Sequence, residues 1–135
     1  AVEKVKIVAR YLDGRTIKGF TQDFAPHKPS FHIFRMEAAN PTETAQVFLR
    51  DLKAVFFVRD FGGRADYDDR KQYHPGEHPS GRIVEVTFTD GEVMVGSTLG
   101  YDPKRPGFFL FPADPQSNNA RVFVLSRAVR LVRYP

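Results

Sequence analysis

The sequence predicts an all-β protein made of two tandem five-stranded small barrels that pack together. The main observation is an internal repeat of 77 residues, because Asp13-Gly14 recurs as Asp90-Gly91 (90 − 13 = 77) and Gly19 recurs as Gly96. Apolar and polar residues also alternate before each Asp-Gly pair, and this period of two is typical of half-buried strands. Finally, the chain has thirteen phenylalanines, whose rings lack a polar atom and therefore favour an apolar core.

The first copy opens with a strand over residues 4–12, in which valine, isoleucine and alanine alternate with lysine and arginine. Asp13-Gly14 predicts a two-residue hairpin turn, because both residue types tolerate a positive φ. A returning strand follows over residues 15–24, and Gly19 within it indicates a bend. Asp51 is expected to cap a short helical turn at residues 52–54. The remaining strands are predicted at residues 31–34, 45–49 and 55–58.

The second copy repeats this plan, with strands predicted at residues 84–88, 92–99, 108–111, 121–124 and 129–133. Ser126-Arg127-Ala128 takes the place of the capped turn. Alignment of residues 53–55 with residues 127–129 gives an offset of 74 (127 − 53 = 74), which predicts a second copy three residues shorter than the first (77 − 74 = 3). The predicted organisation is a first barrel at residues 1–60, a linker rich in glycine, proline and charge at 61–81, and a second barrel at 82–135.

Each copy has fewer than about 60 residues, and a core of that size is marginal in isolation, so we expect the barrels to pack against each other. Phe56 and Phe57 are adjacent and must point to opposite faces of their strand. One is expected in the first core and the other against a different part of the molecule. The equivalent Phe31 and Phe108 are both expected to be buried.

The composition narrows the class of protein. The net charge is +4, a mild bias toward anionic partners, and the chain has no cysteine for disulfides or thiolate metal sites. No apolar run approaches the roughly 20 residues of a membrane helix, and charges interrupt the first ten residues where a signal peptide would be apolar. These features predict a cytoplasmic protein without membrane insertion.

No motif predicts catalysis or a cofactor. His74-Pro75-Gly76-Glu77-His78 has the spacing of an inverted zinc-protease motif, but proline and glycine inside it break the helix that this motif needs. Asp66, Asp68 and Asp69 lack the spacing of a calcium loop and are interpreted as a solvated acidic turn. The chain also lacks a phosphate-binding loop and an ordered Ser-His-Asp set. We therefore expect no catalytic residues, no metal and no cofactor.

The first copy resembles the opening motif of the Sm-like family of small barrels, in which an apolar strand is followed by Asp-Gly-Arg and a bent strand with glycine. Here these are Val5–Tyr11, Asp13-Gly14-Arg15 and Gly19. The resemblance implies SH3-like/Sm-like small barrels and, as a function, RNA binding. The RNA-binding residues of that family are not matched, since Phe24–Lys28 has the sequence Phe-Ala-Pro-His-Lys where Sm proteins carry an acidic residue and a Met-Asn pair.

A second resemblance is to PilZ domains, bacterial barrels that bind cyclic di-GMP through arginines before the barrel and an Asp/Asn-x-Ser-x-x-Gly loop after the second strand. Residues 102–107 have the Asp-to-Gly spacing, with lysine at the serine position, and the linker is basic. The predicted ligand-binding residues are two basic segments converging on one rim of the second barrel: Arg64, Arg70, Lys71, Asp102, Lys104, Arg105 and Gly107. The chain as a whole also resembles an uncharacterised bacterial domain family.

The favoured function is a non-enzymatic binding or regulatory module that recognises an anionic small molecule, with a cyclic nucleotide as one candidate, or a protein partner. The alternative is an Sm-like RNA-binding protein, whose affinity would fall steeply with salt because phosphate contacts release counterions. A third hypothesis, a metal-dependent enzyme using the histidines of the linker, would be recognised by metal analysis.

Overall fold

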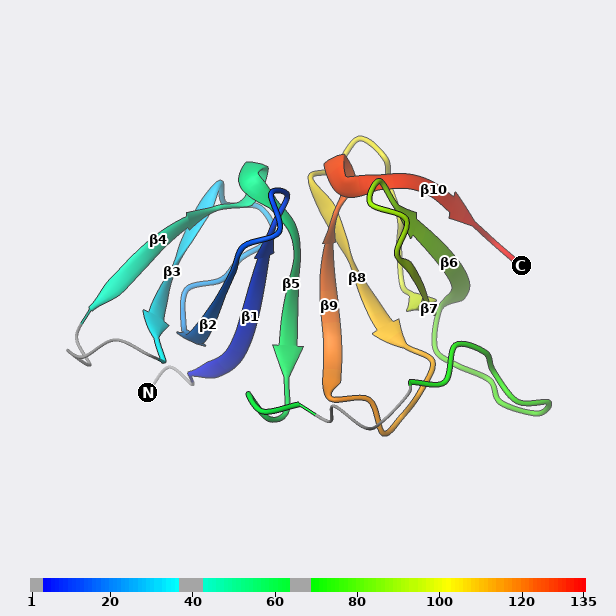
Figure 1. Ribbon diagram of the computed structural model, residues 1–135. Helices are drawn as coiled ribbons and strands as arrows, with labels where there is room; N and C mark the ends of the chain where they lie inside the picture. The colour runs from blue at the N-terminus through cyan, green and yellow to red at the C-terminus, as the bar shows by residue number, and fades with distance from the viewer. Residues whose placement is uncertain (1–3, 37–42, 64–68) are drawn as a thin grey trace.

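The computed structural model describes residues 4–36, 43–63 and 69–135 (Figure 1). Within these ranges the chain forms ten strands and two 3-10 turns, so the predicted all-β class is confirmed. The first half contains β1 (Val5–Tyr11), β2 (Thr16–Thr21), β3 (Ser30–Arg35), β4 (Thr44–Phe48), the turn η1 (Leu49–Asp51) and β5 (Leu52–Val58). The second half contains β6 (Arg82–Phe88), β7 (Val93–Thr98), β8 (Gly107–Pro112), β9 (Asn119–Leu125), the turn η2 (Ser126–Ala128) and β10 (Val129–Arg133).

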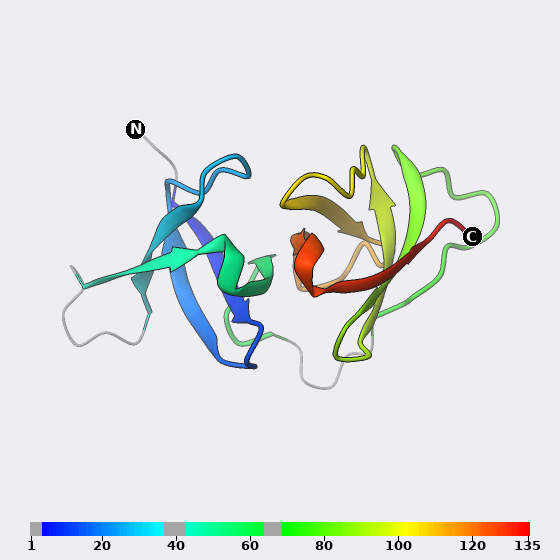
Figure 2. The ribbon, with the colours of Figure 1, turned by 90° about the horizontal axis from the view of Figure 1, so that it is seen from above.

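The described strands form one antiparallel sheet, which is not closed, in the order β10-β6-β7-β8-β9-β5-β1-β2-β3-β4. In each half the fifth strand lies beside the first, and the fourth strand is farthest from it. The halves join where β5 pairs with β9, for example with Val55 opposite Phe123. Figure 1 shows these two strands side by side at the centre, and Figure 2 shows a curved half on each side of them. The two predicted barrels are therefore parts of a single sheet.

Two apolar cores lie on opposite faces of the sheet, and the junction strands β5 and β9 contribute to both. On β5, Phe57 belongs to the first core, while its neighbour Phe56 packs against the second. On β9, Phe123 belongs to the first core, whereas Val122 and Val124 belong to the second. Alternation of side chains along a strand explains this division. The prediction that Phe56 and Phe57 face different environments is confirmed, and each half completes its core with residues of the other.

The repeat of 77 residues holds through all five strands of each half. The turn η2 begins 77 residues after η1 (126 − 49 = 77). In the last strand, Phe88 pairs with Val129 where Tyr11 pairs with Leu52, again at an offset of 77 (129 − 52 = 77). The predicted offset of 74 and the shorter second copy were wrong, because that alignment matched β5 with η2.

Both Asp-Gly turns place glycine at a positive φ, +94° at Gly14 and at Gly91. Asp13, in contrast, does not have a positive φ, and the amide of Tyr11 donates to the carbonyl oxygen of Arg15 at 2.8 Å. This pattern is a three-residue loop, in which a type I turn is followed by a glycine bulge. The predicted two-residue turn was therefore one residue too short, because only the glycine uses the left-handed region.

The helical turn before the fifth strand was also misplaced in the first copy. It covers Leu49–Asp51 and not residues 52–54, and no side chain caps it. Leu52 and Ala54 are already in β5, where both are fully buried, so packing of the cores takes precedence over the capping signal at Asp51. The described residues contain no helix with the length and apolar character needed to cross a lipid bilayer.

A buried lysine ties the two halves together beside η1. Lys53 is 4% exposed and lies at an irregular point of β5, where the pairing with β1 shifts register. Its Nζ donates to Asp90 Oδ2 at 2.6 Å and to Glu92 Oε1, both in the β6–β7 hairpin of the second half. The lysine holds the pKa of Asp90 below its usual value. A buried cation is tolerated only when it is paired, so this contact fixes the second hairpin against the first half.

Candidate functional site

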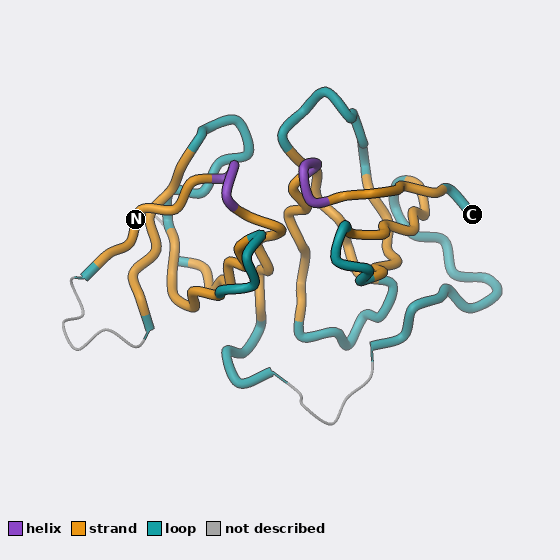
Figure 3. Tube along the Cα trace, turned by 45° about the horizontal axis from the view of Figure 1, so that its top comes forward, coloured by secondary structure: helices purple, strands orange, loops and turns teal. Residues whose placement is uncertain are grey.

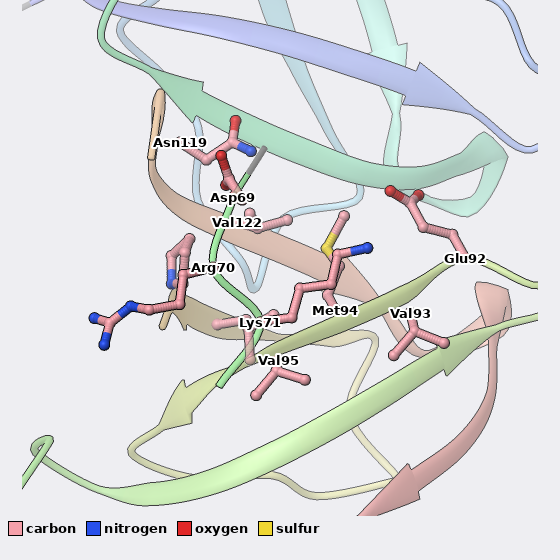
Figure 4. Close-up of a pocket in the computed structure, with 11 residues that line it drawn as sticks. Asp69, Arg70, Lys71, Glu92, Val93, Met94, Val95, Asn119 and Val122 are labelled. Atoms are coloured by element: carbon pink, nitrogen blue, oxygen red, sulfur yellow. The ribbon is translucent and has the colours of Figure 1, made fainter. Parts of the chain in front are cut away.

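The linker residues of the predicted site form one wall of a pocket of about 530 Å³ in the second half (Figure 4). Arg70 and Lys71 both line it, whereas Arg64 lies outside the described residues. The guanidinium of Arg70 donates to both carboxylate oxygens of Glu77, at 2.6 and 3.1 Å, and to the carbonyl oxygen of Ala113 at 3.0 Å. These bonds neutralise its charge, so Arg70 anchors the linker to the end of β8.

The rim of this pocket carries both signs of charge above a floor of valine, leucine and methionine side chains. Figure 4 shows the Lys71 side chain extending toward Met94. Asp69 and Glu92 also line the pocket; the first accepts a hydrogen bond from Ser117 Oγ at 2.5 Å and the second binds Lys53. An anion in this pocket would meet two carboxylates beside Lys71, so its electrostatics do not favour an anionic ligand.

The Glu77 anchor predicts a specific pH dependence of stability. Hydrogen bonds from Arg70 and from the amide of His74 lower the pKa of Glu77 from 4.5 to about 2. A carboxylate with a depressed pKa in the folded state stabilises fully above its unfolded pKa, and this contribution is lost as pH falls from 4.5 to about 2. We therefore expect Glu77→Gln to lower the melting temperature at neutral pH and to match the wild type near pH 2.

Thermal melts of both proteins across this pH range check the prediction. Glu43→Gln is the control, since the structure shows no ion pair for Glu43 among the described residues, and it should differ little from wild type throughout. A melting-temperature difference for Glu77→Gln that stayed constant down to pH 2 would contradict the assignment.

The other predicted segment lies at the opposite end of β8. Asp102, Lys104 and Arg105 precede this strand, which begins at Gly107, whereas Arg70 binds the carbonyl of Ala113 just beyond the strand's end. Six strand residues separate the two segments by roughly 17 Å. Figure 1 shows residues 69–81 of the linker at the lower end of the second half and the loop before β8 at its upper end. The two basic segments therefore do not converge. Arg70 and Lys71 lie near the end of β8, whereas Lys104 and Arg105 lie before its start.

Asp102 itself stabilises the loop that carries it. Its Oδ1 accepts a hydrogen bond from the amide of Lys104 at 2.9 Å, and its Oδ2 lies 3.9 Å from Nε of Arg105. The carbonyl of Arg105 accepts a hydrogen bond from Ser126 Oγ at 2.9 Å, which attaches the loop to η2. The aspartate is therefore a turn-forming residue, and the loop extends toward the junction between the halves.

At this junction the structure forms a groove of about 330 Å³ that combines residues of both halves, which we call the cationic groove. Figure 3 shows the two 3-10 turns close together there, on the same side of the molecule. The floor is apolar: Pro26, Pro29, Phe48, Leu49, Pro106 and Leu125. The rim is basic: His27, Lys28, Arg50 and Arg127. None of the residues lining the groove is acidic.

The repeat explains why basic residues gather at this place. Lys28 in the loop before β3 is equivalent to Arg105 in the loop before β8 (105 − 28 = 77), and Arg50 in η1 is equivalent to Arg127 in η2 (127 − 50 = 77). Of these four residues, Lys28, Arg50 and Arg127 line the groove, and Arg105 lies next to the lining residue Pro106. The sequence contained a signal, since His27-Lys28-Pro29 and Lys104-Arg105-Pro106 share the order basic-basic-proline. Sequence reasoning missed it by treating the first loop as a connection only.

The arginines of the rim keep most of their hydrogen-bonding capacity. The guanidinium of Arg50 stands 4.9 Å from the ring centre of Phe48, and its Nε lies 4.0 Å from Asp51. One nitrogen of Arg127 donates to the carbonyl oxygen of Arg50 at 3.2 Å. Each guanidinium has five N–H donors in a planar fork, so both can still bind an anion with two donors.

The described residues hold no group of three or more histidines or carboxylates arranged for a metal ion. The segment around His74 is a loop, as interpreted from its proline and glycine, and Glu77 within it is occupied by Arg70. Asp66 and Asp68 lie outside the described residues.

One histidine–carboxylate pair occurs on β3. Nδ1 of His32 lies 2.7 Å from Asp23 Oδ2. Burial raises the pKa of Asp23, but hydrogen bonds from His32 and Thr21 outweigh it and hold that pKa below the usual value. Asp23 also accepts a hydrogen bond from the backbone amide of His32, so the pair fixes the entry of the chain into β3.

Comparison with known proteins places the chain in a family. A family model matches residues 3–134, which include all ten strands. The chain belongs to DUF6982, a family of unknown function. No curated protein and no solved structure matches the chain. The matched residues of this chain include both halves, and with them the β5–β9 junction and the residues that line the cationic groove. Membership agrees with the expected uncharacterised family but names no activity, so the resemblances to Sm-like and PilZ barrels stay hypotheses.

Proposed function

We propose that this DUF6982 protein is a non-enzymatic binding module that recognises an anionic ligand in the cationic groove. The observation that carries the proposal is the set of four basic side chains around an apolar floor, with no acidic residue in the lining. A groove of about 330 Å³ falls within the usual size range of small-molecule sites. The buried side chains of Leu49 and Leu125 place apolar surface beside these charges.

The rim favours phosphate or carboxylate groups on chemical grounds. The planar guanidinium groups of Arg50 and Arg127 match two oxygens of such a group, while Lys28 supplies a mobile point charge. The two arginines occupy equivalent positions in the repeat, so a ligand with two anionic groups, such as a cyclic dinucleotide, has one arginine for each. A protein partner with an acidic surface segment satisfies the same chemistry.

The site belongs to a fold that we propose is a tandem of SH3-like/Sm-like small barrels, at residues 1–60 and 82–135. Three features support this interpretation. Each half has the strand order fifth-first-second-third-fourth, a glycine in the second strand where the third approaches, and a 3-10 turn before the fifth strand. In this interpretation the ligand binds beside the junction, where the fifth strand of the first barrel (β5) pairs with the fourth strand of the second barrel (β9).

A ligand screen with matched variants tests the function. Thermal shift against cyclic dinucleotides, mononucleotides and short RNA should identify a stabilising ligand, since a ligand that binds only the folded state raises stability. The double variant Lys28→Glu with Arg50→Glu should weaken that ligand at least about 100-fold while leaving the melting temperature of the free protein nearly unchanged. Two charge-assisted contacts of about 1.5 kcal/mol each give a change of this size.

Lys71→Glu is the matched control, because Lys71 is basic and lines the linker pocket instead. It should bind like the wild type. Loss of binding in Lys71→Glu, with affinity retained in the groove variant, would move the site to the linker pocket.

RNA binding is the second candidate, supported by the two pairs of basic residues that the repeat places on one side of the molecule. A phosphodiester backbone following Lys28, Arg50, Arg105 and Arg127 would neutralise several phosphates. The logarithm of its affinity would then fall linearly with the logarithm of salt concentration, by about 0.7 per phosphate contact for a single strand. A slope near zero with a tight small-molecule ligand would exclude this alternative.

A further inference from the structure

A second groove adjoins the cationic groove and differs from it in character. It has a volume of about 420 Å³ and is lined mainly by Leu99, Tyr101, Phe108, Phe109, Phe111 and Phe123; we call it the aromatic groove. Leu99 is 75% exposed and Phe111 36% exposed, so part of this lining faces solvent. Exposed apolar surface within a groove is characteristic of a binding site.

The two grooves form one continuous surface. Pro26 lines both of them. Arg105 lines the aromatic groove and the next residue, Pro106, lines the cationic groove. Phe123 and Leu125 lie two residues apart on β9 and so on the same face, the first beneath the aromatic groove and the second beneath the cationic groove.

Basic side chains without an acidic neighbour in the lining occur at one end of this surface. The charged side chains lining the aromatic groove are Asp102 and Arg105, which lie 3.9 Å apart and offset each other. The cationic groove has basic side chains and no acidic lining residue. A ligand that follows the whole surface therefore needs an anionic group at one end and an apolar chain or ring at the other.

We propose that the ligand is a soluble anionic amphiphile, with its charged group in the cationic groove and its apolar part in the aromatic groove. This inference rests on the proposed function, because it requires the anionic group to bind Lys28, Arg50 and Arg127. It adds that apolar contacts with the aromatic groove supply much of the affinity.

Alkyl phosphates of increasing length test the proposal, using isothermal titration calorimetry on the full chain below the concentrations at which the probes form micelles. Each methylene that enters an apolar groove should lower Kd about two- to fourfold. Octyl phosphate is therefore expected to bind at least about tenfold more tightly than butyl phosphate. Octyltrimethylammonium, with the same chain and the opposite charge, should bind much more weakly than octyl phosphate.

Two variants separate the groups of contacts. Leu99→Ser with Phe111→Ser changes the exposed large apolar side chains of the aromatic groove. It should remove the dependence on chain length while leaving butyl phosphate binding unchanged. Leu99→Ser alone, at the more exposed position, should reduce this dependence if the double variant folds poorly. Lys28→Glu with Arg50→Glu should weaken every alkyl phosphate.

Each outcome decides between the two proposals. Equal affinities for butyl and octyl phosphate would overturn the amphiphile inference while leaving anion binding intact. Binding of octyltrimethylammonium as tight as that of octyl phosphate would overturn the anionic requirement. Binding only to vesicles of anionic lipid, with none of the soluble probes bound, would also overturn the inference. Failure of every alkyl phosphate and every anion of the ligand screen would overturn the proposed function itself.

Discussion

Replacement of Phe123 by alanine is expected to lower the free energy of unfolding by about 3–5 kcal/mol, the usual range for a large buried aromatic side chain. Phe123 is buried in the first core although it belongs to a strand of the second half. Its ring contacts Phe24 and Phe109, at centroid distances of 5.3 and 5.1 Å. The change therefore leaves a cavity between the halves, and chemical denaturation should show both halves unfolding in one transition.

Three comparisons control this prediction. Phe31 and Phe108 are buried at equivalent positions in the first and second cores, as the repeat predicted, and alanine at either should cause a loss of similar size. Phe111 is partly exposed, so Phe111→Ala should change stability by less than about 1 kcal/mol. Two separate unfolding transitions for Phe123→Ala, with only one affected, would show that the halves fold independently of the junction.

Replacement of Gly96 by alanine is expected to lower the free energy of unfolding by about 3 kcal/mol, at the upper end of the range for overpacked positions. A Cβ atom at this residue would lie 2.2 Å from the carbonyl oxygen of Phe111 and 3.0 Å from Cγ of Leu110. Backbone atoms cannot move aside without breaking the β7–β8 pairing, in which Gly96 lies opposite Pro112. Urea denaturation of the variant and the wild type measures the difference.

Gly100→Ala provides the matched control for this substitution. Nothing lies within 4 Å of a Cβ atom at Gly100. The added methyl group should therefore leave stability unchanged or raise it by about 0.4–1 kcal/mol, by restricting the unfolded chain. A loss below about 0.5 kcal/mol in Gly96→Ala would mean that the strands separate easily at this point and that the glycine is not required.

The sequence was informative wherever structure depends on local pattern. Alternation in β1 and β6 predicted both strands. Gly19 and Gly96, from which a bend was predicted, are positions where a Cβ atom would collide with the backbone of the next strand. The residues of β5 are apolar on both faces, which correctly indicated that Phe56 and Phe57 enter different environments. The partner of β5 could not be predicted, because pairing with β9 depends on contacts between residues more than 60 positions apart, for example Val55 with Phe123 (123 − 55 = 68).

The candidate site was only partly predictable for a related reason. Lys104 and Arg105 were correctly placed on a loop before the third strand of the second copy. The prediction that they lie beside the basic residues of the linker was wrong. Which strand ends meet at one side of a sheet depends on the topology, and the order of the strands in the sequence does not determine it. The basic residues that do approach this loop, Arg50 and Arg127, come from turns whose position next to each other depends on the junction.

The way in which the halves join also limits how far the sheet can grow. The junction uses the fourth strand of one half and the fifth strand of the other, so the outer strands β4 and β10 are again a fourth and a fifth strand. These two edges are complementary, so β4 of one molecule could pair with β10 of the next. Repetition of that contact would join molecules head to tail into rings or fibres. At the outer edges, however, Gln46 stands where the junction has Phe123 (123 − 46 = 77), and Arg133 stands where it has Phe56 (133 − 56 = 77). Polar and charged side chains on edge strands oppose the addition of another strand. Gln46 and Arg133 therefore disfavour pairing between molecules at edges whose strand order would allow it.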